Sequence, residues 1–144
     1  MQKRNMDKLQ YAMRSFEDAL KYTRTAEFQM LGIEFKGILI SAVVQNFGLT
    51  FAVCKQMIAL QLADRIGQEA TDRMTPEVLF RTAAKEGIIS NVEHWLEYLD
   101  CEHLNPSSNV ALRTFEKATA FLTDARELLG TCTKRSQNER RRAA

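Results

Sequence analysis

The residue types that could carry chemistry gather in one stretch, between Ser90 and Asn109. This stretch, SNVEHWLEYLDCEHLNPSSN, holds the only tryptophan, both histidines, one of three cysteines and one of two prolines. Histidine titrates near neutral pH, and together with cysteine and carboxylates it can bind a metal or act as an acid or base. The sequence therefore places its candidate site here.

A metal site is the first chemistry to consider. His94, Glu97 and Cys101 stand at spacings of three and four residues, which places them on one side of a helix. A structural zinc site, however, uses four ligands in a recognisable Cys/His pattern, and the sequence contains no such pattern. We therefore expect these side chains to belong to a solvated helix face, and we predict neither a metal nor a cofactor.

Catalysis by a histidine or a nucleophile has little support in the same stretch. At 100° per residue, His103 shares a helix face with Trp95 and Leu99, which favours a core or interface histidine over a catalytic one. No Cys/His/Asp order suggests a nucleophile triad, and the glycines are too dispersed for a phosphate-binding loop. The residues alone predict a helical domain with an interaction surface and not an enzyme.

Composition and charge favour a single helical domain. Of the 144 residues, 45% are apolar and 26% are charged, and only six glycines and two prolines interrupt the chain. The net charge of +2 is uneven, because the segment after Gly130 holds five bases and one acid and leaves the body mildly acidic. Such a body is unlike a basic nucleic-acid-binding fold. Three cysteines without a Cys-x-x-Cys pair, and an N-terminus without an apolar signal core, predict a cytoplasmic protein.

Apolar periodicity and capping residues predict the helices. They are expected at residues 6–25, 35–66, 75–87, 90–104 and 110–129, with connections at 26–34 and 67–74. Thr75 and Pro76 should begin the third helix and Gly87 should end it. Ser90 and Glu93 fit a capping box for the fourth. Residues 1–130 are predicted to form one bundle domain, and residues 131–144 a basic, disordered tail.

The segment at residues 35–66 is apolar on nearly every side. Such a helix must be covered all round, and a bundle of four or five helices of this size covers one face fully. We interpret the remaining apolar surface of this helix as evidence for oligomerisation. The alternative is that the bundle encloses the helix completely. Residues 37–54 lack formal charge over 18 residues, the lower limit for a membrane span, but Gln45 and Asn46 at their centre argue against one.

The order of these elements resembles the nucleotidyltransferase substrate-binding proteins, a branch of the HEPN superfamily. The similarity covers about residues 7–129. It rests on the pattern Gly-apolar-Ile-x-x-x-x-x-Trp-x-x-Tyr at Gly87–Tyr98 and on Gln45-Asn46-Phe47 in the long helix. The resemblance implies an all-α, up-and-down bundle of four or five helices. It also implies that the chain forms homodimers and works beside a small, separate minimal nucleotidyltransferase.

Active HEPN relatives are ribonucleases that act as toxins, and the resemblance implies where their motif would lie. The motif is an arginine, an adjacent polar residue, a histidine five positions after the arginine and often a tyrosine two further on. The nucleotidyltransferase can modify that tyrosine with nucleotides. Aligned from Trp95 and Tyr98, the four positions are occupied by Glu102, His103, Ser107 and Asn109.

These replacements predict that nuclease activity is lost. RNA cleavage needs positive charge beside the phosphate and an acid or base near the 2′-hydroxyl. Glu102 is negative, Ser107 does not titrate near neutral pH, and Asn109 has no phenolic oxygen. We therefore predict a non-catalytic subunit of a two-protein, toxin–antitoxin-like system, with a nucleotide or RNA as its candidate ligand. The resemblance places the substrate or partner groove at Trp95, Tyr98, Glu102, His103 and Gln45.

Two alternatives remain open at the level of sequence. The first is a HEPN-type RNA-binding protein or ribonuclease toxin whose active site is displaced, with His103 and Ser107 as the acid/base pair. The second is a stand-alone structural bundle that forms dimers. A nucleotidyltransferase gene immediately beside this one would separate the second alternative from the favoured prediction.

Overall fold

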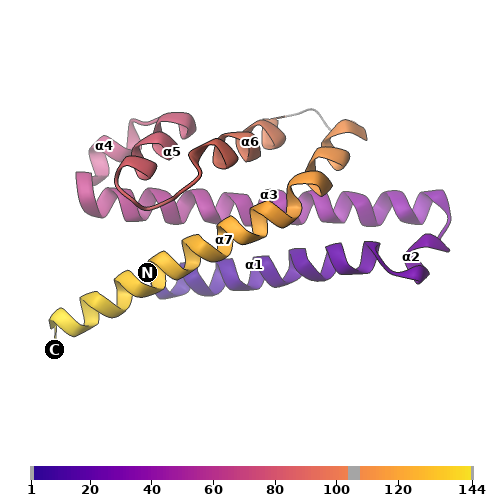
Figure 1. The fold of residues 1–144 in the computed structure, drawn as a ribbon, viewed down its shortest axis with the longest axis horizontal. Helices are drawn as coiled ribbons and strands as arrows, with labels where there is room; N and C mark the ends of the chain where they lie inside the picture. Colours follow the sequence, from indigo (N-terminus) through magenta and orange to yellow (C-terminus); the bar gives the residue numbers. More distant parts are fainter. Residues whose placement is uncertain (1, 104–107, 144) are drawn as a thin grey trace.

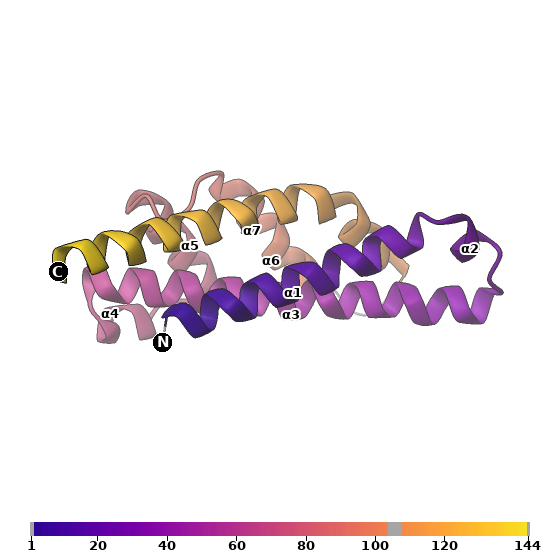
Figure 2. The same ribbon diagram turned by 90° about the horizontal axis from the view of Figure 1, so that it is seen from below.

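Seven helices make up the secondary structure of residues 2–103 and 108–143, the part of the chain that the computed structural model describes (Figure 1). They are α1 (Gln2–Thr23), α2 (Ala26–Gln29), α3 (Ile33–Ile66), α4 (Gln68–Asp72), α5 (Pro76–Lys85), α6 (Val92–His103) and α7 (Ser108–Ala143). The long helices α1, α3, α6 and α7 alternate in direction (Figures 1 and 2). The predicted all-α, up-and-down bundle is confirmed, while the two predicted connections contain the short helices α2 and α4.

α1 lies along α3 through the apolar stripe that the sequence predicts. All four side chains of the stripe are buried: Leu9, Met13, Phe16 and Leu20. The buried Thr50 joins the two helices, because its hydroxyl lies 2.7 Å from the carbonyl oxygen of Asn46 on α3 and 3.3 Å from that of Ala12 on α1. Apolar burial thus holds the pair together, and one polar contact helps to fix its register.

The centre of the bundle is an aromatic cluster to which five helices contribute. Its members are Phe16 of α1, Phe47 and Phe51 of α3, Phe80 of α5, Trp95 and Tyr98 of α6, and Phe121 of α7. The ring of Phe51 lies in the middle, with its centroid between 5.9 and 6.4 Å from those of five neighbours. Pairs at such distances contribute about 0.5–1.5 kcal/mol beyond the burial of their area. The cluster therefore fixes α5, α6 and α7 around α3.

The predicted start and end of α5 are confirmed. Thr75 Oγ1 accepts a backbone hydrogen bond at 3.4 Å, and Pro76 occupies the first turn. At the other end, Gly87 has a φ of +73°, a conformation that favours glycine. The backbone N–H of Ile88 then donates to the carbonyl of Ala83 at 2.9 Å, which closes the helix with a Schellman motif.

The predicted capping box at the start of α6 is wrong. Ser90 Oγ donates to Glu127 Oε1 of α7 at 2.5 Å and does not cap its own helix. Asn91 immediately precedes the helix at a φ of +53°, and its carbonyl accepts from the backbone N–H of His94 at 2.8 Å. Asparagine tolerates this left-handed conformation better than most residues. The turn at Asn91 therefore leaves Ser90 one residue too early to act as the cap.

The last helix is longer than the sequence predicts. An end at Gly130 and a disordered tail over residues 131–144 are expected, but α7 continues through Gly130 to Ala143. Glycine inside a helix costs about 1 kcal/mol relative to alanine. Contacts beyond it offset this cost, because Cys132 is buried and Arg135 reaches Gln61 of α3. The basic segment is therefore a helical extension that lies against the end of α3.

α3 is covered on one side only, and it forms one edge of the bundle in Figure 2. Its buried residues lie between Val43 and Leu62, whereas Phe35, Ile38 and Leu49 are 63–65% exposed. By length and composition the helix could cross a membrane, a test that core helices of soluble proteins also pass, and 28% of its most apolar window is buried. Complete enclosure, the alternative at the level of sequence, is therefore wrong for the single chain.

Candidate functional site

Trp95 and Tyr98, which the sequence assigns to a groove, lie in the core. Their exposed fractions are 1% and 0%, and their rings meet edge to face with centroids 5.7 Å apart. The helical period explains the correction, because both residues stand on the side of α6 that faces the aromatic cluster around Phe51. They position α6 and offer no surface to a ligand in the single chain.

Glu102 and Gln45 lie on the surface but are not brought together. Glu102, in the last turn of α6, forms an ion pair with Lys55 of α3, at 2.8 Å between Oε1 and Nζ. Gln45 is exposed on another part of α3. It lies ten residues before Lys55, which is about 15 Å along the helix axis. Lys55 also lies over the ring of Phe51, 5.2 Å from its centroid. The four residues of the predicted groove whose side chains the structure describes therefore do not form one site.

The remaining positions of the degenerate motif are His103, Ser107 and Asn109. His103 is the last residue of α6 and Asn109 lies in the first turn of α7. Their side chains, and the whole of Ser107, fall outside the described residues. The predictions for these three positions stay predictions.

The metal ligands that the sequence suggests are engaged elsewhere. His94 Nδ1 lies 3.0 Å from Asp124 Oδ2, and Glu97 pairs with Lys117 at 2.5 Å. Cys101 is buried. Among the residues that the structure describes, no three His, Cys, Asp or Glu side chains are grouped so that they could hold a metal ion.

The cysteines are poor nucleophiles. All three are free and buried. Burial raises the pKa of Cys132 to about 11 against the lowering effect of Arg135, and burial also raises the pKa values of Cys54 and Cys101 above the usual thiol range. Because a thiol attacks as the thiolate, none of the three is a candidate catalytic group.

A buried carboxylate between α6 and α7 is the polar feature that the sequence reasoning missed. Asp124 is 5% exposed, and its Oδ2 accepts a hydrogen bond from the Tyr98 hydroxyl at 2.5 Å and faces His94 Nδ1 at 3.0 Å. We call these three residues the Asp124 cluster. Burial raises the pKa of Tyr98 far above its usual range, and the hydrogen bond to Asp124 adds to this. A signal was present, since Phe121, Asp124 and Leu128 share one helix face.

The Asp124 cluster holds an imidazole in a fixed orientation but has no room for a substrate. Fixing Nδ1 on a carboxylate is how many enzymes orient a histidine base, and the His94 side chain is 45% exposed. The recess beside it, lined by Trp95, Asp124, Glu127 and their neighbours, has no space for even a water-sized group. The cluster is therefore a structural polar contact that connects α6 to α7.

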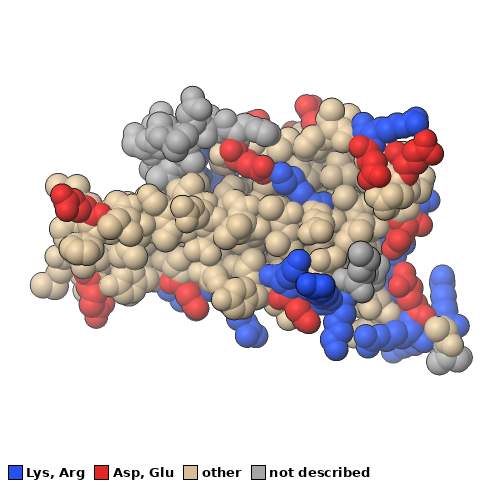
Figure 3. Space-filling model, turned by 180° about the vertical axis from the view of Figure 1, so that it is seen from behind, with Lys and Arg blue, Asp and Glu red and all other residues tan. Residues whose placement is uncertain are grey.

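One exposed strip of α3 consists mostly of apolar residues. At 100° per residue, five of the exposed residues of this helix fall within about 100° of one another; they are Phe35, Ile38, Gln45, Leu49 and Ala52. We call them the α3 face. Beside it, a groove of about 520 Å³ runs between α1 and α3 and is lined in part by Tyr11 and Leu49. Figure 3 shows this side of the molecule as a continuous band of uncharged residues, with acids and bases along its edges.

Comparison with known proteins agrees with the architecture. A family model described as "Nucleotidyltransferase substrate binding protein like" matches residues 4–134. The fold is also similar to that of a solved Haemophilus influenzae protein, described as the fold of a substrate binding domain of a nucleotidyltransferase. The TM-score is 0.79 at 20% identity, over 89% of this chain and 98% of that chain. No curated protein gives a significant match.

Proposed function

Because the chain belongs to the family of nucleotidyltransferase substrate-binding proteins, we propose that it is a non-catalytic subunit that holds a substrate for a separate nucleotidyltransferase. The two proteins form a toxin–antitoxin-like pair in the cytoplasm, and this subunit is a homodimer. The ion pair of Glu102 with Lys55 supports the non-catalytic role. On the resemblance to HEPN proteins, this neutralised acid stands where a HEPN-type nuclease would carry arginine.

The α3 face is the observation that carries the proposal of an assembly. Phe35, Ile38 and Leu49 are each more than 60% exposed, and Tyr11 beside them is 75% exposed. Contiguous apolar surface of this kind marks interaction sites in soluble proteins. None of the five residues of the face is charged, and Glu34 at its N-terminal end is the one charged residue of α3 within the same arc, so two copies related by a two-fold axis meet over a largely uncharged surface. A second copy of the chain is therefore the occupant that fits it.

We expect the protein to be a dimer that Leu49→Glu converts to a monomer. Glutamate would place a charge in the middle of the α3 face, where it would be buried opposite its own copy. Sedimentation velocity at micromolar concentration measures the change, and circular dichroism checks that the fold is kept. Val78→Glu is the matched control, because Val78 is 46% exposed on α5. A monomeric parent protein, or equal dissociation of both variants, would contradict the proposal.

Association with a nucleotidyltransferase is tested by co-expression with a minimal nucleotidyltransferase from the same genome. We expect the tagged chain to retain that enzyme through affinity and size-exclusion steps, while the purified chain alone leaves single-stranded RNA intact. A matched comparison uses a nucleotidyltransferase from an unrelated pair, which should not be retained. RNA cleavage that disappears in His103→Ala would overturn the non-catalytic role, and failure to retain any partner would overturn the two-protein system.

A further inference from the structure

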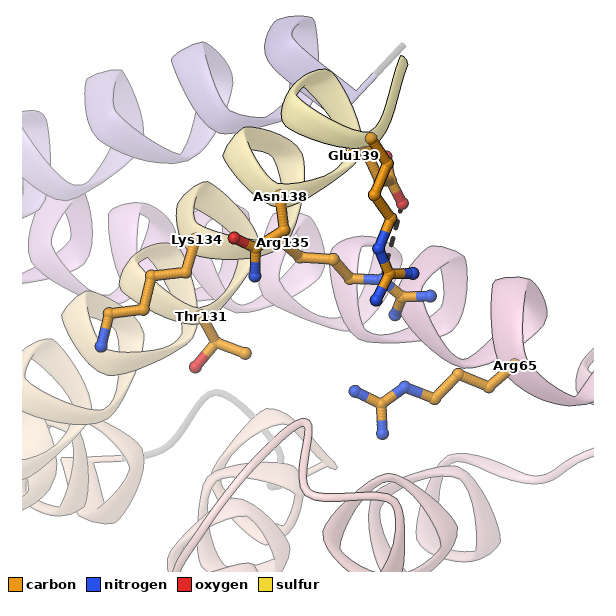
Figure 4. A pocket seen from close by; sticks show the side chains of 7 residues that line it. Arg65, Thr131, Lys134, Arg135, Asn138 and Glu139 are labelled. Carbon is orange, nitrogen blue, oxygen red and sulfur yellow. Dashed lines mark ion pairs between the residues drawn. The ribbon is translucent and has the colours of Figure 1, made fainter. Parts of the chain in front are cut away.

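The end of the molecule where α3 and α7 finish contains a cleft of about 440 Å³. It is lined by Arg65, Thr131, Lys134, Arg135, Asn138, Glu139 and Arg142, and we call it the basic cleft. Figure 4 shows Arg65 of α3 and Arg135 of α7 extending toward each other, while Lys134 of α7 extends in another direction, past Thr131. It exists because α7 continues as a helix beyond Gly130 and so brings its basic residues beside α3.

Two of the cations are held in place by neutral oxygens. Arg135 Nη1 donates to the side-chain oxygen of the buried Gln61 at 2.8 Å and to its carbonyl oxygen at 3.2 Å. Arg65 donates to the backbone carbonyl of Glu86. A carbonyl orients a guanidinium without cancelling its charge, and a guanidinium has five N–H donors. Both side chains therefore keep charge and spare donors while giving up much of their freedom of motion.

The other two cations of the basic cleft are available to a ligand. Within the described residues, Lys134 and Arg142 make no recorded hydrogen bond or ion pair, and both are exposed. Three acids form ion pairs with the two cations held by neutral oxygens: Glu139 lies 3.7 Å and Asp64 4.0 Å from Arg135, and Glu86 lies 3.8 Å from Arg65. Among the seven residues that line the cleft, four are bases and one is an acid. The lining therefore carries a formal charge of +3.

We propose that the basic cleft binds the polyphosphate of a nucleoside triphosphate, an inference that rests on the proposed function of the chain as a substrate-binding subunit. Arginine and lysine recognise phosphate oxygens through charge-assisted hydrogen bonds. The volume suits a small ligand, and Asn138 supplies an uncharged amide at the same wall for the nucleoside part. A nucleic-acid strand would need a longer basic track, whereas the acid Glu139 interrupts the bases along α7.

The test is isothermal titration of the full-length protein with ATP, inorganic tripolyphosphate and adenosine. ATP and tripolyphosphate should bind, and more weakly as salt is raised because exposed charges are screened, whereas adenosine should not. Lys134→Glu combined with Arg142→Glu should weaken ATP binding by at least about tenfold, or about 1.4 kcal/mol. Arg140→Glu combined with Arg141→Glu is the matched control, since it makes the same charge change on the same helix outside the lining of the cleft.

Several results would overturn the basic cleft as a triphosphate site. They are the absence of ATP binding, equal losses in the two double variants, adenosine binding as strong as that of ATP, and displacement of ATP by a short single-stranded RNA at far lower concentration. The dimer and the association with the nucleotidyltransferase are measured on the same double variants. If the dimer and the association both persist while ATP binding is absent, the proposal of a triphosphate site is wrong and the proposed function stands. If both are lost in the parent protein, the proposed function itself fails.

Discussion

Replacing Phe51 with alanine is expected to lower the free energy of unfolding by about 3–5 kcal/mol. The side chain is fully buried, and its ring meets those of five other aromatic residues on four helices. Its removal leaves a cavity between rigid rings that have little freedom to collapse into it, so the lost transfer free energy and the cavity both count. Within the aromatic cluster, only Phe121 of α7 meets as many other rings as Phe51 does.

Urea denaturation followed by circular dichroism measures this change, and Phe35→Ala is the matched control. Phe35 lies on the same helix but is 63% exposed, so its replacement should alter the free energy of unfolding of the monomer by less than about 0.5 kcal/mol. The comparison is made at a concentration where the protein is monomeric, because Phe35 belongs to the α3 face. Equal losses for the two variants would show that the aromatic cluster is not the centre of stability.

Patterns that depend on neighbours in sequence were predicted well. The α1 stripe is buried because a spacing of three and four residues puts those side chains on one face whatever the partner helix is. Thr75 and Gly87 act as cap and stop because their hydrogen bonds close within one helix. The all-α class follows from such local signals, whereas the up-and-down bundle was implied by the family resemblance.

Features that depend on contacts between distant residues were predicted poorly. Gly130 is a plausible helix end by propensity, but Arg135 and Gln61, separated by 74 positions, extend α7 past it. Ser90 is a plausible cap, but its hydroxyl is taken by Glu127, 37 positions away. The groove prediction failed in the same way, because no local pattern distinguishes a core aromatic such as Trp95 from one that lines a binding surface.

The two proposed binding surfaces are independent of each other. Leu49 in the α3 face and Arg65 in the basic cleft lie sixteen residues apart on α3, which is about 24 Å along its axis. One helix thus presents an uncharged side for a copy of the chain and a charged end for an anion. A dimer built on the first surface leaves the second open, so a bound polyphosphate remains accessible to a separate enzyme.

Replacing Asp124 with leucine is expected to lower the free energy of unfolding by about 1–3 kcal/mol, because it leaves the Tyr98 hydroxyl buried without an acceptor. Tyr98 is 0% exposed and its hydroxyl donates to Asp124 Oδ2 at 2.5 Å, so water cannot replace the carboxylate without opening α6 from α7. The contact of His94 with Asp124 contributes less to the free energy of unfolding, because the His94 side chain is 45% exposed and solvent screens the interaction.

A double-mutant cycle separates the buried hydroxyl from a general packing effect of Asp124→Leu. Asp124→Asn keeps an oxygen acceptor and should lose less stability than Asp124→Leu, measured by urea denaturation at neutral pH. Tyr98→Phe removes the donor, so in the Asp124→Leu background it should recover part of the loss. An Asp124→Leu variant as stable as the parent would mean that desolvating the carboxylate costs as much as its hydrogen bonds return, as happens in some buried ion pairs. In that case the Asp124 cluster would be retained for something other than stability.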